Sequence, residues 1–218
     1  MKITKALVLA TLVLLALSPR PASAIVLGLD WGLGQSVAHV NYKGHNMDVW
    51  AGKMAGYLGG SLGNPKPPAD GEFFGYVYCV DLDHTIGLPT EYEVTRETTA
   101  ALTHGARAAW LYNSYLSSTT DASTAAALQL ALWDVVVDNG DGFGSGQFLY
   151  TGGLSASTET EATSMLASSL NRASSATYFR PVAGGQAMIG PVPEPGSVLL
   201  LGLGLGLSLT GVALRRRR

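Results

Sequence analysis

The chain has 218 residues, of which 47% are hydrophobic, and its formal net charge is −2. The charge is unevenly distributed, because residues 25–191 hold 7 basic and 15 acidic side chains and so carry a net charge of −8. A segment of this size can form one domain with its own core, and its acidity makes it a poor binder of nucleic acids, so no nucleic-acid partner is expected. We therefore expect a single acidic domain between two basic ends.

The first 24 residues have the organisation of a secretory signal peptide. Lys2 and Lys5 form a basic start, and the largely apolar stretch 6–17 that follows has twelve residues, which is too short to span a bilayer comfortably. Residues 22–24, Ala-Ser-Ala, form a small-residue site for signal peptidase. The sequence therefore predicts a signal helix in residues 1–24, with an uncleaved anchor as the alternative, and export of a mature domain over residues 25–191.

Residues 25–82 contain short segments with strand patterns. Residues 37–42 and 47–51 are expected to form two strands joined by a turn at 43–46. The segment 64–68 is rich in proline and is expected to be an exposed loop, because proline cannot donate a hydrogen bond within a sheet.

A further strand is expected over residues 72–82, where apolar side chains alternate with period two. The alternation places one set of side chains on one face: Phe74, Tyr76, Tyr78, Val80 and Leu82. It places another set on the opposite face: Phe73, Val77, Cys79 and Asp81. Cys79 is the only cysteine, and an exported chain with one cysteine cannot close an internal disulfide.

Three later segments have helical composition and are expected to form helices: 96–116, 124–137 and 157–171. Gly105 weakens the first by about 1 kcal/mol relative to alanine. Asp121 or Ser123 can cap the second, and Ser157 the third. Residues 177–189 are expected to be extended. The elements predict an α+β domain, in which a β-sheet or a small β-barrel or sandwich carries a helical insertion.

Gln129 lies in the most apolar of these helices, which is hydrophobic on all sides and should be buried. Burying a carboxamide without partners costs a few kcal/mol. Gln129 therefore either hydrogen-bonds to backbone at the sheet or has reacted with a neighbouring group.

Two motifs taken together resemble the bacterial Cys-Gln thioester domains of surface adhesins. Tyr78-Cys79-Val80-Asp81 lies on the predicted strand, and Leu128-Gln129-Leu130-Ala131-Leu132-Trp133 follows on the helix about fifty residues later. The resemblance implies a thioester between Cys79 and Gln129, shielded from water by Tyr78 and Trp133. It implies a single-use covalent adhesive that reacts with a target amine, with no cofactor and no enzymatic turnover. A buried free Cys79 that acts as a small hydrophobe is the alternative.

The last 27 residues form a separate unit. Pro193-Glu194-Pro195 is followed by 18 uncharged residues, 197–214, and then by Arg215, Arg216, Arg217 and Arg218. Such a segment can just cross a bilayer as a helix, and the arginines favour the cytoplasmic side. The three parts resemble the PEP-CTERM sorting tail of proteins exported by Gram-negative bacteria. The known thioester adhesins mostly carry Gram-positive anchors, so the tail departs from their pattern.

The sorting-tail resemblance implies a C-terminal transmembrane helix in the inner membrane and cleavage near the Pro-Glu-Pro motif by an exosortase. The expected location is the cell surface or the extracellular matrix. Two functions fit this location. One is covalent attachment to an amine-bearing target, and the other is an inert structural role in the extracellular polysaccharide matrix. An uncharacterised hydrolase is a third, less supported function.

Other candidate sites have weaker patterns. His84 or His104 could act as a base for Cys79. However, His84 follows Cys79 by five positions, and a residue at that spacing along a strand faces the other side. The four histidines lack metal-ligand spacing. Residues 138–142, Asp-Asn-Gly-Asp-Gly, resemble a calcium loop only in part, since the acidic third position and the closing glutamate are missing. A turn is expected there, and no metal site is predicted.

Overall fold

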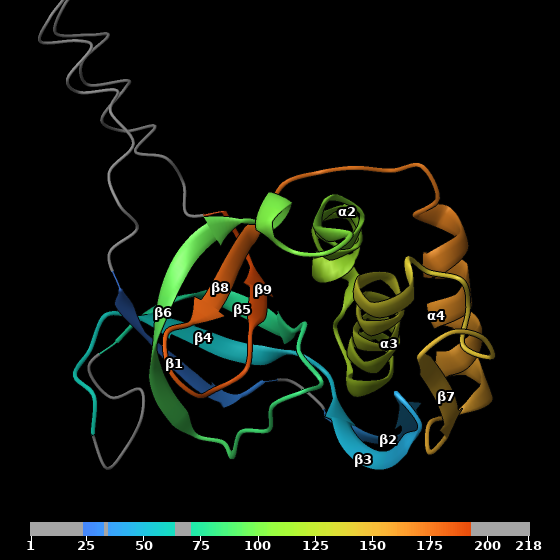
Figure 1. Cartoon of the computed structure of the whole chain (residues 1–218), viewed down its shortest axis with the longest axis horizontal. Helices are drawn as coiled ribbons and strands as arrows, with labels where there is room; N and C mark the ends of the chain where they lie inside the picture. Colours follow the sequence, from blue (N-terminus) through green and yellow to red (C-terminus); the bar gives the residue numbers. More distant parts are fainter. Residues whose placement is uncertain (1–23, 33–34, 64–70, 193–218) are drawn as a thin grey trace, which may run out of the picture.

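The structure is a computed structural model that describes residues 24–32, 35–63 and 71–192. These residues form a mixed α and β fold with a closed six-stranded barrel on one side and a group of helices, with a small sheet, on the other (Figure 1). The predicted combination of a small barrel with a helical part is therefore confirmed. Residues 1–23 of the predicted signal peptide, the predicted loop 64–68 and residues 193–218 of the predicted sorting tail lie outside the described residues. Within the described part, no helix is long and apolar enough to cross a membrane.

The barrel consists of antiparallel neighbours. Its strands follow one another around the barrel in the order β1 Ile25–Trp31, β4 Met54–Leu58, β5 Glu72–Cys79, β9 Met188–Gly190, β8 Thr177–Pro181 and β6 Thr90–Thr98. Val77 of β5 and Phe179 of β8 are fully buried. Both side chains pack against Gly190 of β9, where an added Cβ would lie within 3 Å of each. The last strand in the sequence, β9, thus closes the barrel between β5 and β8.

The last residues of β5 keep the predicted alternation, but its first residues do not. The backbone of Cys79 pairs with Met188. The Tyr78 ring lies on the opposite face from the Cys79 side chain and packs against Tyr112 of a helix. A bulge between β4 and β5 inserts Phe74 as an extra residue, so its ring turns inward and contacts Phe179 with centroids 5.2 Å apart. The prediction that Phe74 shares a face with Tyr78 is therefore wrong, because a bulge shifts every earlier residue by one position.

β5 also ends three residues earlier than predicted, at Cys79. Val80 still donates to the Ala187 carbonyl at 2.9 Å. The Asp81 carboxylate then accepts the backbone N–H groups of Asp83 at 2.9 Å and His84 at 3.3 Å. This local turn competes with the sheet ladder and terminates the strand.

A second sheet contains β3 His45–Ala51, β2 Ser36–Tyr42 and β7 Phe148–Gly152, in that order. β2 and β3 form the predicted hairpin. Lys43 and Gly44 at its turn both have positive φ, 50° and 85°, which matches the right-handed twist of two strands joined by a two-residue turn. The sequence prediction for this hairpin is confirmed to within two residues.

The helices lie side by side next to the barrel (Figure 1). They are α2 Gly105–Tyr115, α3 Ala122–Asp138 and α4 Ala156–Ser168, with 3₁₀ turns at Thr99–Ala101 and Leu116–Ser118. α3 lies between α2 and α4 and is buried over most of its length, as its apolar composition predicts. Asp121 caps α3 through a reciprocal pair of hydrogen bonds with Thr124, so Asp121, rather than Ser123, is the capping residue.

The predicted helix 96–116 is wrong in its first half, where the chain forms the end of β6 and a 3₁₀ turn. Gly105 is the first residue of α2, not a weak point at its centre. A Cβ at this position would lie 1.8 Å from the Thr99 carbonyl oxygen, so the close approach of two backbone segments requires glycine here. The third helix is also shorter than predicted, and Ser155 caps it instead of Ser157.

Candidate functional site

The fold brings Cys79 and Gln129 together. Cys79 is the last residue of β5, and Gln129 lies in the middle of α3. The Gln129 side-chain nitrogen Nε2 donates a hydrogen bond of 2.7 Å to the Cys79 backbone carbonyl. Both residues are buried, with exposed fractions of 0% for Gln129 and 4% for Cys79. The two residues of the thioester motif are thus direct neighbours, whereas the bond between them stays a prediction.

Only half of the Gln129 carboxamide is satisfied. Nε2 has its partner in the Cys79 carbonyl, but the side-chain oxygen Oε1 is buried and accepts no hydrogen bond among the described residues. A buried unsatisfied polar atom costs about 1–3 kcal/mol. A thioester carbonyl is a weaker acceptor than an amide carbonyl, because sulfur donates less electron density to it than nitrogen does. The environment of Oε1 therefore suits an acyl thioester better than it suits an intact amide.

The Cys79 thiol is held by the turn that ends β5. Its Sγ donates to the Asp81 carbonyl at 2.9 Å and accepts from the Asp81 N–H at 3.3 Å. Burial raises the pKa of the thiol to about 12. The free thiol is thus neutral near pH 7, and neutral thiols are poor nucleophiles. Reaction with Gln129 requires Sγ to leave the Asp81 carbonyl and to lose its proton.

The two aromatic residues of the motifs occupy different positions. Trp133 lies one turn after Gln129 on α3, is buried, and lines the same cavity as Cys79. Tyr78 is buried on the opposite face of β5, where its ring meets Tyr112 with centroids 6.3 Å apart. Trp133 therefore lies beside the Cys79 side chain, where it could shield it, whereas Tyr78 does not line the cavity that Cys79 lines.

A cavity of about 430 Å³ opens beside Cys79. Its lining is mainly apolar and includes Trp31, Trp50, Met54, Leu88 and Trp133. Trp31 and Trp50 are half exposed, at 51% and 59%, and their rings meet edge to face with centroids 6.0 Å apart. The cavity thus gives a small molecule or side chain a route from the surface to Cys79. Trp31 and Trp50 were not singled out by sequence patterns, and exposed tryptophans at strand ends are the signal that could have found them.

The structure gives no support to a cysteine–histidine pair. The His84 ring nitrogen Nδ1 lies 2.8 Å from the Asp81 carboxylate and is directed to that group. His104 precedes α2 with a left-handed backbone. In the described residues, neither histidine is hydrogen-bonded to the Cys79 thiol, whose partner is Asp81.

Comparison with protein families, with curated proteins and with solved structures gave no match. The function therefore has to be argued from the geometry around Cys79 and Gln129.

Proposed function

We propose that the protein is an exported adhesive domain that forms an internal thioester between Cys79 and Gln129 and attaches covalently to an amine-bearing target. The observation that carries the proposal is the 2.7 Å hydrogen bond from the Gln129 carboxamide to the Cys79 carbonyl, between two buried residues on different elements. The unsatisfied Oε1 of Gln129 and the cavity beside Cys79 support it.

In the first step, Sγ of Cys79 attacks Cδ of Gln129. The bond from Cδ to Nε2 breaks, and Nε2 leaves as ammonia, which carries away the thiol proton. Cys79 and Gln129 are neighbours through the backbone carbonyl of Cys79. Once Sγ turns toward Cδ, the high effective molarity of groups held close together would offset the low nucleophilicity of a neutral thiol. The burial of both residues, with Trp133 beside Cys79, would slow hydrolysis of the product relative to an exposed thioester.

In the second step, an amine of the target enters through the cavity lined by Trp31 and Trp50 and attacks Cδ of residue 129. The bond from Cδ to Sγ breaks, a proton from the amine passes to the sulfur, and an amide joins the target to the chain. Cys79 is again a free thiol. The reaction happens once per molecule, so the protein is not a turnover enzyme, and no cofactor is needed.

The proposal also includes the predicted processing of both ends. Signal peptidase would cut after residue 24, and the helix 197–214 would hold the chain in the inner membrane through the arginines at 215–218. An exosortase would then cut near Pro193-Glu194-Pro195 and release the domain to the cell surface or extracellular matrix. The resemblance of the tail to PEP-CTERM sequences supports this part.

The intact mass of a chain covering residues 25–192 tests the thioester. The expected mass is lower than that of the sequence by one ammonia, and incubation with methylamine should add one methylamine to this mass. Cys79→Ala and Gln129→Glu should each abolish both effects. Gln147→Glu, at an exposed glutamine in a loop, is the matched control and should keep them.

A chain of full mass with one titratable thiol would contradict the thioester. The protein would then be better explained as an inert component of the extracellular polysaccharide matrix, with Cys79 as a buried small hydrophobe.

A further inference from the structure

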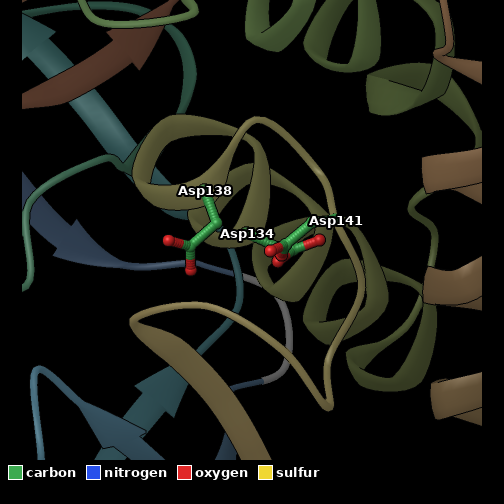
Figure 2. A group of neighbouring side chains, drawn as sticks. All are labelled: Asp134, Asp138 and Asp141. Carbon is green, nitrogen blue, oxygen red and sulfur yellow. The ribbon is translucent and has the colours of Figure 1, made fainter.

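Three carboxylates gather where α3 ends, away from the Cys79–Gln129 contact. Asp134 and Asp138 lie one turn apart on α3, and Asp141 follows in the loop that leads to β7 (Figure 2). One oxygen from each side chain lies within 4.8 Å of the others. We call this set the acidic group.

The acidic group is electrostatically unfavourable without a cation. Like charges at this spacing repel, and the C-terminal end of a helix already carries partial negative charge. Arg107 is close, but its guanidinium donates to the carbonyls of Asn139 and Leu166 and to the Ser169 hydroxyl. None of the ion pairs found in the described residues includes a member of the acidic group.

The second observation is a buried oxygen with no partner. Asp134 has an exposed fraction of 0%. Its Oδ2 accepts the Gly142 N–H at 3.2 Å, but Oδ1 is buried and accepts no hydrogen bond among the described residues. Figure 2 shows its carboxylate next to that of Asp141, inside the curve of the loop. A buried carboxyl oxygen with no donor of its own is stabilised by a proton or by a positive ligand, and two neighbouring carboxylates favour a bound cation.

The backbone holds the group in place. Oδ2 of Asp138 accepts the N–H groups of Gln147 at 2.9 Å and Phe148 at 2.7 Å, which fixes the start of β7 to the end of α3. The Gly142 N–H fixes the loop to Asp134 in the same way. The carboxylates of Asp134 and Asp138 are therefore positioned by backbone contacts that do not involve one another, and Asp141 lies in the loop that the Gly142 contact fixes.

We propose that Asp134, Asp138 and Asp141 bind a calcium ion. Carboxylate oxygens are hard ligands, and calcium accepts them at about 2.3–2.6 Å, so two ligands on opposite sides of the ion are up to about 5 Å apart. The corresponding limit for magnesium is about 4.2 Å, because its ligands lie at about 2.0–2.1 Å. The observed upper spacing of 4.8 Å fits the larger ion. Water and backbone carbonyls complete the shell.

Calcium titration of the full-length chain in detergent, after removal of divalent ions with a chelator, tests this site. Isothermal titration should show one site, and the midpoint of thermal unfolding should rise with calcium concentration. At a calcium concentration 100 times Kd, the unfolding equilibrium constant should fall about 100-fold. Magnesium at the same concentration should give a smaller rise.

Asp141→Asn is the decisive variant, because Asp141 is exposed and its loss should not disturb folding. The variant should lose most of the calcium response, whereas Glu93→Gln, at an exposed carboxylate on β6, should keep it. A wild-type chain that shows no saturable binding would overturn the proposal. So would a calcium response of equal size in Asp141→Asn, or an equal response to magnesium.

Discussion

At the scale of single residues, the state of Cys79 decides how the site behaves. The side chain is buried, and its thiol is bound to Asp81. Gln129 is equally buried, and half of its amide has no partner. Each residue alone could be an ordinary part of a core, since free cysteines are among the most buried residue types and buried amides occur where they find donors and acceptors. Because Cys79 and Gln129 are in contact, a single site can explain both the buried cysteine and the half-satisfied amide.

The raised pKa of Cys79 leads to a prediction about pH. In a Gln129→Ala chain the thiol is free, and burial raises its pKa from the ordinary value of 9.0 to about 12 in the folded state. The folded state therefore keeps a proton that the unfolded state releases. This contribution to stability is full below pH 9 and is lost as the pH rises toward 12.

Denaturant unfolding between pH 8 and pH 11 would measure this effect. The Gln129→Ala chain should lose more stability over this range than a Cys79→Ala chain, which has no thiol to titrate. The wild type should resemble Cys79→Ala if its sulfur is held in a thioester. Equal slopes in all three proteins would contradict the predicted burial of the thiol.

At the scale of elements, local signals predicted some segments well. The hairpin of β2 and β3 has a Lys-Gly turn, and α3 has both a capping aspartate and a continuous apolar run. These features act within a few residues, so sequence alone can identify them. The contact of Cys79 with Gln129 was also anticipated, but from a resemblance between motifs and not from local physics.

Other elements could not be predicted from local signals. β6 alternates buried Tyr92 and Val94 with charged residues, and the alanines that follow extend an apparent helical pattern back into it. Phe74 faces inward because of a bulge, and no local sequence signal predicts that bulge. Asp134 was overlooked because it lies inside an apolar helix, and its partners come from the next loop.

A Gly105→Ala substitution tests whether helix propensity or backbone packing dominates at the start of α2. Helix propensity alone predicts that Gly105→Ala stabilises α2 by about 1 kcal/mol. The contact with the Thr99 carbonyl predicts the opposite, a loss of about 3 kcal/mol, because the new Cβ forces the backbone to shift. Thermal and denaturant unfolding decide between the two.

Gly144→Ala is the matched control for this experiment. Its added Cβ meets no atom within 4 Å, so the variant should be close to neutral. A Gly105→Ala chain that is more stable than the wild type would show that the backbone at Thr99 moves without cost.

At the scale of the whole molecule, the barrel joins the two ends of the domain. β1 pairs with β4 and β6, and β9 closes the gap between β5 and β8. These pairings link residues far apart in the sequence, and no local pattern encodes the strand order. The barrel also places Cys79 at the end of a strand next to the helical part, which is where Gln129 can reach it.

Truncation tests the role of β9. A chain that stops after Val192 keeps every strand of the barrel and should unfold cooperatively. A chain that stops after Gly184 lacks β9, which leaves β5 and β8 unpaired along one edge and exposes core residues such as Val77. We expect it to lose cooperative unfolding, measured by circular dichroism and by amide exchange of β5. Protection of β5 in the shorter chain would show that the barrel does not depend on β9.

If the proposed amide joins residue 129 to a target while the proposed tail helix still holds the chain in the membrane, mechanical tension runs along residues 130–192 and bypasses the earlier part of the chain. The last structured element on this path is β9, which has only three residues. It should detach first under load, and β8 and α4 should follow. The released segment, residues 156–192, has about 37 residues and could extend to about 125 Å. The small strand that completes the barrel would then act as the release point of an extensible tether, and the target would stay attached during a sudden pull.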